Sequence, residues 1–337
     1  MHPDDEMNNV PQQLTKNITG LGYQIRFSRW NANVFGKMYR LYSSTHKLMN
    51  QFTEEQKWEQ LTSRKHRYGY GAAATYYILP SLQAKVSFEH AFRMPEAVEM
   101  FGDGMVQKSN PDLKPESSNN FNAGFLYDQN LGSHRLQAEV NYIYRDTKDF
   151  ILKGVSLTNN PTTSYDNIGN VHTRGIEAML GYSYKRNLHV SGNLTFQDIK
   201  DKMRYEKSQN TYVGDGMNEN ITYGQRLPNI PYFFMNGHAD YNFLDFGKKG
   251  NSLSLNYDVQ YIHDYYLSFT GLGAKATKKV IPEQFCHNVS VGYSMKDGRY
   301  SILLECTDIS NEKLYDNYRL QKPGRSFNVK FRYYITK

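Results

Sequence analysis

The feature that most limits the fold is a recurring alternation of apolar and polar residues. Leu82, Ala84, Val86 and Phe88 alternate with Gln83, Lys85, Ser87 and Glu89. A period of two is typical of a β-strand with one apolar and one wet face. The same pattern predicts thirteen strands, near residues 20–30, 33–42, 68–79, 82–92, 118–128, 134–148, 171–185, 187–199, 230–244, 252–267, 284–295, 299–308 and 325–335.

The connections between these strands alternate in length. Short links lie at 80–81, 129–133, 185–186, 246–250 and 296–298, and long ones at 43–67, 93–117, 149–170, 200–229, 268–283 and 309–324. Transmembrane β-barrels have short periplasmic turns and long extracellular loops. A soluble sandwich has no reason to keep its long loops at one end. We therefore predict an all-β fold, an antiparallel transmembrane β-barrel.

Two of the long connections carry local signals. In 43–67, Thr53-x-x-Gln56 is placed like a capping box before Trp58 and Leu61, which predicts a short helix. In 93–117, three prolines and two glycines predict a loop without regular structure.

Composition fits a barrel better than a soluble core. The hydrophobic fraction is only 39%, yet the chain has 28 Tyr and 18 Phe, an aromatic content that argues against disorder. No apolar run approaches the length of a transmembrane helix, about 18 residues. The net charge of +7 is spread along the chain, so we expect no nucleic-acid partner. Inward-facing Arg26, Lys85 and Arg135 would favour anionic cargo; alternatively they belong to a solvated wall balanced by carboxylates of a plug domain elsewhere.

Thirteen strands do not suit a complete barrel. Bacterial single-chain barrels have even strand numbers, plugged transporters have about 22 strands, and lipid does not tolerate open sheet edges. The sequence therefore predicts about 13 C-terminal strands of a 22-strand barrel. Residues 1–19 would form an N-terminal loop and 20–337 the partial barrel. Met1-His2-Pro3-Asp4-Asp5-Glu6 has no signal-peptide pattern.

Three ordered motifs point to a known family. The first runs from Phe92-Arg93-Met94-Pro95-Glu96 through Asn110-Pro111-Asp112-Leu113-Lys114-Pro115-Glu116 to Gly124. The second is Asn167-Ile168-Gly169-Asn170 through Gly175-Ile176-Glu177, and the third is Thr307-Asp308 through Tyr315 with Pro323-Gly324-Arg325-Ser326-Phe327. Together they resemble the late barrel region of TonB-dependent outer-membrane receptors.

The resemblance implies a receptor in the cell outer membrane for energised uptake of a scarce substrate, with a ferric siderophore expected first. Its partners would be outer-membrane lipid, a plug domain and N-terminal strands that have no counterpart here, the TonB motor acting through that plug, and a small-molecule or metal-chelate substrate. Glycans, peptides and cobalamin remain open as cargo. Alternative functions are a passive porin or adhesin barrel, or a soluble all-β carbohydrate-binding module.

Candidate ligand contacts lie in the long loops. They are Arg93, Phe101, Tyr212, Tyr223, Tyr265, Tyr266 and Phe269. Tyrosine suits this role because it joins an apolar ring to a polar tip. Tyr265 and Tyr266 could equally belong to an interfacial aromatic girdle.

The residues give no case for catalysis, a metal or a cofactor. His2-Pro3-Asp4-Asp5-Glu6 is similar to a zinc-deacetylase signature, but it follows no apolar strand and no His-x-x-His completes it. Asp103, Asp112 and Asp215 lie in glycine-rich loops and could be calcium ligands, although Asp-Gly is ordinary turn chemistry. No nucleophile elbow is present, so we expect no enzyme.

The two cysteines are close in sequence but are expected to stay free. Asp297-Gly298 predicts a hairpin in which Val289 lies opposite Cys306 and Val291 opposite Leu304. Cys286 then faces the polar side and Cys306 the apolar side, and thiols on opposite faces of a sheet cannot form a disulfide.

Overall fold

The structure, a computed structural model, describes residues 11–48, 58–103, 105–156, 162–207, 217–274, 278–317 and 319–335. The chain divides into two compact units, which are described separately. The first unit comprises Met1–Ala74, Val86–Phe121 and Arg145–His172, and the second comprises Thr75–Lys85, Asn122–Tyr144 and Thr173–Lys337.

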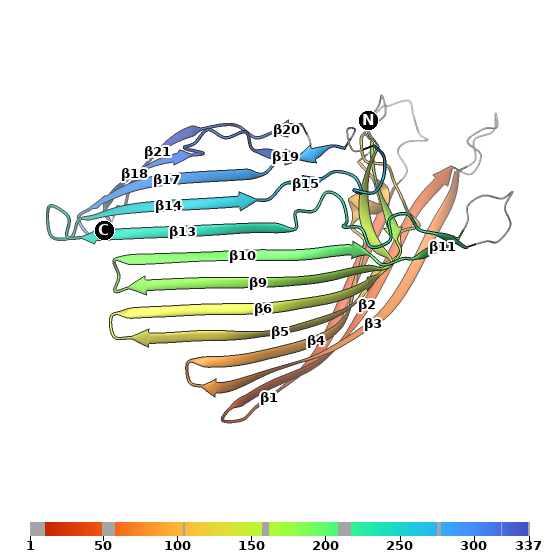
Figure 1. The fold of residues 1–337 in the computed structure, drawn as a ribbon, viewed down its shortest axis with the longest axis horizontal. Coiled ribbons are helices and arrows are strands. Elements are labelled where there is room, and N and C mark those ends of the chain that lie inside the picture. The colour runs from red at the N-terminus through yellow and green to blue at the C-terminus, as the bar shows by residue number, and fades with distance from the viewer. Residues whose placement is uncertain are drawn as a thin grey trace. The chain divides into compact units, whose positions relative to one another are not determined.

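The predicted number of main strands is confirmed. A 13-stranded sheet has the order β1-β2-β3-β4-β5-β6-β9-β10-β13-β14-β17-β18-β21, so its strands are neighbours in chain order (Figure 1). Within the described residues the sheet is not closed, and β1 and β21 are its edges. The strands are β1 Gln13–Arg26, β2 Trp30–Leu48, β3 Trp58–Leu79, β4 Leu82–Arg93, β5 Glu116–Leu131, β6 His134–Lys148, β9 Val171–Tyr184, β10 Leu188–Asp201, β13 Phe233–Leu244, β14 Ser252–Ile262, β17 Gln284–Met295, β18 Tyr300–Thr307 and β21 Ser326–Tyr333.

Residues of similar polarity lie opposite one another across neighbouring strands of the second unit. Leu255 lies opposite Val291, which lies opposite Leu304, which lies opposite Val329. One residue along, the row consists of Asn256, Ser290, Glu305 and Asn328. Because successive side chains point to opposite faces, one face of the sheet is apolar and the other polar. This segregation fixes the register, since a slip of one residue would exchange the faces.

The β17–β18 hairpin has the predicted register. Val289 lies opposite Cys306, and Val291 lies opposite Leu304. Lys296 and Asp297 have φ of 52° and 54°, and Gly298 has φ of 90°, so the turn uses left-handed backbone, which glycine adopts without a steric penalty. Cys286 and Cys306 are free, as the opposite faces require.

The long connections contain regular structure that the sequence pattern did not predict. Four of them form separate two-stranded sheets: β7 Phe150–Ser156 with β8 Thr162–Ile168, β11 Tyr205–Lys207 with β12 Met217–Glu219, β15 Tyr265–Tyr266 with β16 Val280–Ile281, and β19 Tyr315–Asn317 with β20 Leu320–Gln321. Each pairs with itself rather than with the main sheet. The strand predicted at 252–267 therefore ends at Ile262, and Tyr265–Tyr266 belong to the connection that follows it.

Three further expectations differ from the structure. Helix α1, Ala97–Phe101, begins inside 93–117, because a capping box at Glu96 and Glu99 satisfies its first N–H groups. The 43–67 connection is shorter than predicted: β2 ends at Leu48 and β3 begins at Trp58, so Trp58 and Leu61 lie in a strand rather than after a helix. Thr53 and Gln56 lie outside the described residues. β1 begins at Gln13, earlier than the predicted residue 20.

Two small apolar clusters form the core of the first unit. Tyr39, Leu41 and Met94 make one, and Met100, Leu113 and Ile151 make the other. Leu14 of β1 packs against both. Both clusters join the 93–117 connection to strands. Across the described part of the chain, no helix is long and apolar enough to cross a membrane.

Candidate functional site

Arg93 is the centre of an ion-pair cluster in the first unit. Its Nη1 donates to both carboxylate oxygens of Glu99, at 3.0 and 3.1 Å, and its Nη2 donates to Glu116 Oε1 at 2.9 Å. The same Glu116 oxygen accepts the backbone N–H of Ile151 at 2.7 Å. Arg93 therefore ties the end of β4 to α1, the start of β5 and the start of β7. Its charge is already shared by two carboxylates, which favours an architectural role; ligand contact by Arg93 stays a prediction.

Residues of the family-like motifs connect the 93–117 loop to the β7–β8 hairpin. Asn110 Nδ2 donates to Tyr165 O at 2.9 Å. Asn167 is a bridge: its Oδ1 accepts Lys114 N at 2.8 Å, and its Nδ2 donates to Lys114 O and Asp149 O at 3.0 and 2.7 Å. Side-chain amides that satisfy loop backbone groups fix loop shape. The motifs therefore build one loop assembly from two connections.

Asp103 caps the turn that follows α1. Its Oδ1 accepts the backbone N–H groups of Met105, Val106 and Gln107 at 2.9, 2.9 and 2.7 Å. These donors, with Met105 and Gln107 contributing most, hold the pKa of the Asp103 carboxyl below its ordinary value. The Asp103 side chain therefore stabilises a turn, as expected for an Asp-Gly sequence. Phe101, at the end of α1, packs against the Met100 cluster.

A cavity of about 460 Å³ lies in the second unit, where the connections after β10 and β14 meet. Two hydrogen bonds hold these connections together: Gly271 N donates to Gln225 Oε1 at 2.6 Å, and Asn229 N donates to Tyr266 O at 2.7 Å. The lining residues are Lys200, Gly224, Gln225, Arg226, Leu227, Pro228, Ile230, Tyr232, Asp264, Tyr265, Tyr266, Ser268 and Thr270.

Two cations and several aromatic rings set the chemistry of this cavity. Arg226 Nε donates to Asp198 Oδ1 at 2.7 Å, and its guanidinium lies 4.3 Å from the centroid of the Tyr232 ring. Lys200 Nζ lies 2.7 Å from Asp198 Oδ2. One carboxylate thus serves two cations, which remain 42% and 44% exposed. The cavity can therefore offer further N–H donors to anionic oxygens and aromatic faces to flat rings.

The structure brings together part of the predicted set of ligand contacts. Tyr265 and Tyr266 line the cavity, and burial raises the pKa of Tyr265 above its ordinary value. Tyr223 and Phe269 are next in sequence to lining residues, and Tyr223 lies 6.0 Å from the Arg204 guanidinium. Tyr212 lies outside the described residues.

Asp198, Lys200 and Arg226 were not predicted. Their one sequence signal is a pair of opposite charges two residues apart, Asp198 and Lys200, which places both on the same face of β10.

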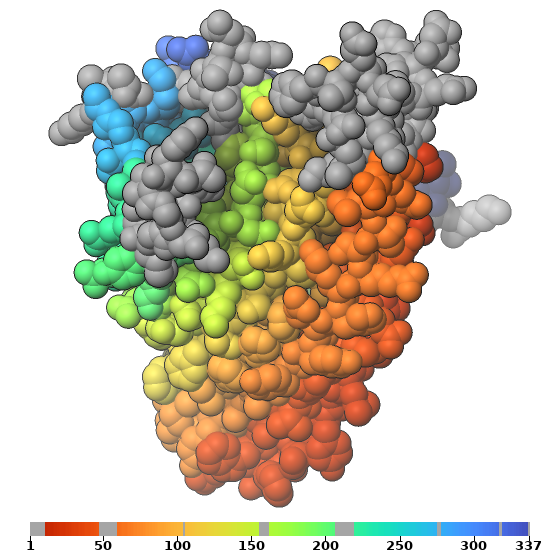
Figure 2. Space-filling view, turned by 90° about the vertical axis from the view of Figure 1, so that its right-hand side faces the viewer, coloured from red at the N-terminus to blue at the C-terminus, as the bar shows by residue number. Residues whose placement is uncertain are grey.

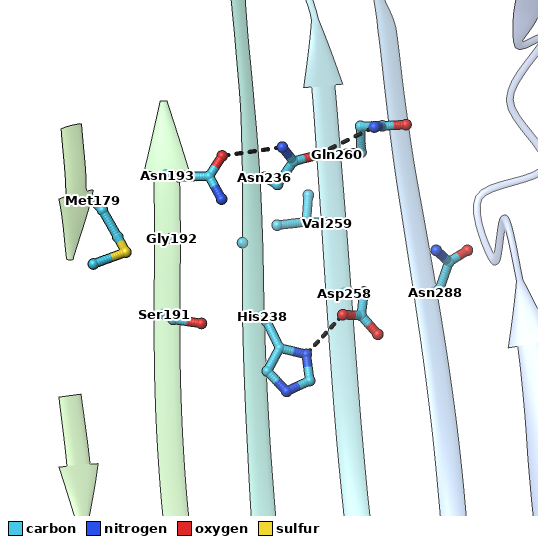
Figure 3. A pocket seen from close by; sticks show the side chains of 11 residues that line it. Met179, Ser191, Gly192, Asn193, Asn236, His238, Asp258, Val259, Gln260 and Asn288 are labelled. Atoms are coloured by element: carbon cyan, nitrogen blue, oxygen red, sulfur yellow. Dashed lines mark hydrogen bonds and ion pairs between the residues drawn. The ribbon is translucent and has the colours of Figure 1, made fainter. Parts of the chain in front are cut away.

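A second pocket, of about 420 Å³, lies over β10, β13 and β14 (Figure 3). Asn236 Nδ2 donates to Asn193 Oδ1 at 3.1 Å, and Gln260 Nε2 donates to Asn236 Oδ1 at 3.2 Å. His238 lies between carboxylates, with Nδ1 2.7 Å from Asp258 Oδ1 and Nε2 3.3 Å from Asp240 Oδ1. These polar groups bind one another, so the pocket is a hydrogen-bonded wall with less to offer a charged ligand than the Arg226 cavity.

Two of the three inward cations are also balanced within the wall. Lys85 Nζ lies 3.1 Å from Glu139 Oε1, and Arg135 Nη2 lies 2.8 Å from Asp128 Oδ2. Arg26 donates to Gln24 at 3.3 Å. For Lys85 and Arg135 the structure favours the balanced wall, although the balancing carboxylates belong to nearby strands of the same sheet rather than to another domain.

Within the described ranges, no three His, Cys, Asp or Glu side chains are grouped to hold a metal ion. His2 and Asp4, and likewise Asp215, lie outside those ranges.

An antiparallel sheet with one apolar and one polar face, short turns at one end and long hairpin-bearing connections at the other defines the wall of a transmembrane β-barrel. The family described as "TonB dependent receptor-like, beta-barrel" matches residues 21–307. The chain belongs to that family, whose members are outer-membrane β-barrels. No curated protein sequence matches.

Solved receptor structures have the same fold. The chain is similar to "Copper transporter OprC" (TM-score 0.69, 14% identity, 95% of this chain and 47% of that one). It is also similar to "the siderophore receptor PiuA from Acinetobacter baumannii" (TM-score 0.69, 14% identity, 96% and 43%). A third is "the ferric yersiniabactin uptake receptor FyuA from Yersinia pestis" (TM-score 0.63, 14% identity, 96% and 45%). The chain spans about half the length of these relatives.

Proposed function

We propose that the chain is part of the barrel of an outer-membrane receptor that takes up a scarce small molecule or metal chelate, with a ferric siderophore as the first candidate. Membership of the receptor family supports the transport class, and two of the three similar structures named above are receptors for siderophores or ferric chelates. In this proposal a plug domain completes the barrel interior, the TonB motor acts on that plug, and the apolar face contacts outer-membrane lipid.

The cavity around Arg226 is the observation that supports a chelate as cargo. Ferric chelates present anionic oxygens, often on flat rings, and such groups match guanidinium and ammonium donors beside tyrosine rings. Arg226 and Lys200 supply the donors, and Tyr232, Tyr265 and Tyr266 supply the rings. Passive diffusion through a porin would need no such cavity.

The test measures binding and uptake of a radiolabelled ferric chelate by cells that carry the receptor containing this chain. Arg226→Gln removes one charge-assisted interaction, about 1.5–3 kcal/mol, so Kd should rise about 10- to 100-fold. Arg186→Gln is the matched control, because Arg186 is exposed in the short β9–β10 turn, away from the cavity. Its effect should be less than about threefold, the weight of an exposed charge.

Three results would contradict the proposal. Uptake that continues after the inner-membrane energy source is dissipated would indicate a passive porin. Binding of a glycan or of free copper, with no binding of any ferric chelate, would change the cargo. Equal losses in Arg226→Gln and Arg186→Gln would remove the cavity from the binding site.

A further inference from the structure

The first four strands carry many basic residues and very few acidic ones. Residues 11–48 contain no Asp or Glu, and residues 58–93 contain only Glu59 and Glu89. Glu89 is paired with Lys37 at 2.7 Å. The basic residues in these ranges whose side chains are described are Lys16, Arg26, Arg29, Lys37, Arg40, Arg64, Lys65, Arg67, Lys85 and Arg93. Lys16, Lys85 and Arg93 pair with carboxylates outside these ranges, so the positive charge of this region is only partly compensated.

Two of these cations lie on the apolar face of the sheet. Arg40 has the parity of Val34, which pairs with exposed Tyr23. Arg64 on β3 lies over the ring of Tyr42, with its guanidinium 5.5 Å from the ring centroid, so Arg64 and Tyr42 share a face. A step of two residues along each antiparallel strand then places Arg40 beside His66.

Exposed aromatic side chains indicate where these cations lie relative to the membrane–water interface. Two and four residues after His66 come Tyr68 and Tyr70, which are 68% and 58% exposed. The Tyr70 ring lies 6.4 Å from that of Phe88 on β4. Aliphatic residues such as Leu21, Val34 and Val86 follow along the same face. A belt of exposed aromatic residues at the end of an apolar band is typical of the membrane–water interface.

Arg40, Arg64 and His66 therefore lie just beyond this belt of exposed aromatic residues, at the depth of lipid head groups. Both arginines and the histidine are exposed, and Asn17, which pairs with Arg40 on β1, adds an amide. By parity, Glu59 belongs to the opposite face, so no carboxylate within the described part of β1–β4 competes on this one. The strands that carry the patch are red to orange in Figure 2.

We propose that Arg40 and Arg64, with His66, bind the phosphate of a lipid in the surrounding leaflet. Guanidinium groups bind phosphate with two parallel hydrogen bonds, and basic side chains at an anionic lipid surface are each favourable. The acyl chains of that lipid lie along the exposed rings and aliphatic residues below. The site is distinct from the cargo cavity and rests only on the apolar face being in contact with lipid.

The experiment counts bound lipids by native mass spectrometry. The receptor containing this chain is released from nanodiscs of phosphatidylcholine with a minor fraction of phosphatidic acid, which supplies the phosphate group. The double variant R40Q/R64Q should lower the apparent affinity for phosphatidic acid about 30-fold, the effect of two basic side chains at an anionic lipid surface. R67Q is the matched control: it removes one charge from the same strand, but from the opposite face.

Each outcome decides the proposal. Selective loss in R40Q/R64Q, with R67Q close to the unmodified receptor, supports it. Unchanged binding in R40Q/R64Q, or an equal loss in R67Q, overturns it. Inorganic phosphate that competes as well as the lipid would also overturn it, because the surface would then recognise the anion alone. A heat-modifiable gel band shows that each variant is folded. Cargo uptake does not enter the readout, so failure here leaves the proposed transport function standing.

Discussion

Removing the Glu116 carboxylate should loosen the loop assembly of the first unit. Glu116 Oε1 accepts two hydrogen bonds, from Arg93 Nη2 at 2.9 Å and from Ile151 N at 2.7 Å. In Glu116→Ala the N–H of Ile151, a residue only 5% exposed, is left buried without a partner, which costs about 1–3 kcal/mol. Arg93 keeps Glu99 and is 41% exposed, so its lost contact adds only about 0–1 kcal/mol. We expect about 2–3 kcal/mol in total, mostly as local opening.

Hydrogen exchange followed by mass spectrometry measures this opening in the segments that contain β7 and β8. Two kcal/mol corresponds to a loss of protection of about 30-fold. Glu305→Ala is the control, because Glu305 makes an ion pair of 2.8 Å with exposed Lys330 and no such link to a buried N–H. Its effect should stay below about 1 kcal/mol. Unchanged exchange at Ile151 in Glu116→Ala, or equal effects of the two variants, would refute the reasoning.

Three further predictions concern the barrel wall. Phe331→Arg on β21 should lower the free energy of unfolding in lipid by about 2–4 kcal/mol if the residue lies near the bilayer midplane, as denaturant titration would show; no change would reverse the assigned faces. Single cysteines at Lys108 and Lys296 should be labelled from outside intact cells at the first position only, and labelling at Lys296 would invert the topology. Gly124→Ala places a Cβ against the carbonyl oxygen of Val140 and the side chain of Asn141, so it should destabilise the sheet by about 1–3 kcal/mol, which a lowered Tm would detect.

The main sheet was predictable because its signals are local. Alternation identifies a strand from its own residues, and Asp297-Gly298 with the flanking apolar residues sets the β17–β18 register, which is why the free state of Cys286 and Cys306 followed from parity. No knowledge of distant contacts was needed.

Strand extensions were missed where buried residues are polar. Ser43, Ser44 and Thr45 in β2 are 4–6% exposed, yet they do not contribute to an apolar stripe. The pattern therefore ends near residue 42 although the hydrogen-bonded strand continues to Leu48. Helix α1 was missed because prolines and glycines on both sides obscured its capping box.

The candidate cavity was only half predictable. The adjacent tyrosines Tyr265 and Tyr266 stand out as aromatic residues in a polar loop. Arg226 and Lys200 do not, because Arg226 reaches Asp198 only when the connection after β10 folds back on that strand. A pair of charges is uninformative in sequence until the backbone brings the partners together.

The self-paired hairpins of the long connections have a consequence for evolution and engineering. β7–β8, β11–β12, β15–β16 and β19–β20 each form a two-stranded sheet outside the hydrogen-bond ladder of the main sheet. β7, β8, β15 and β19 also bond to neighbouring segments near their bases, while short turns and facing residues set the register of the main sheet. The tip of a hairpin can therefore change in length or sequence without disturbing the main sheet. Such units can diverge while the main sheet is kept, and a loop from a related barrel could be grafted as a cassette at the same two strand ends.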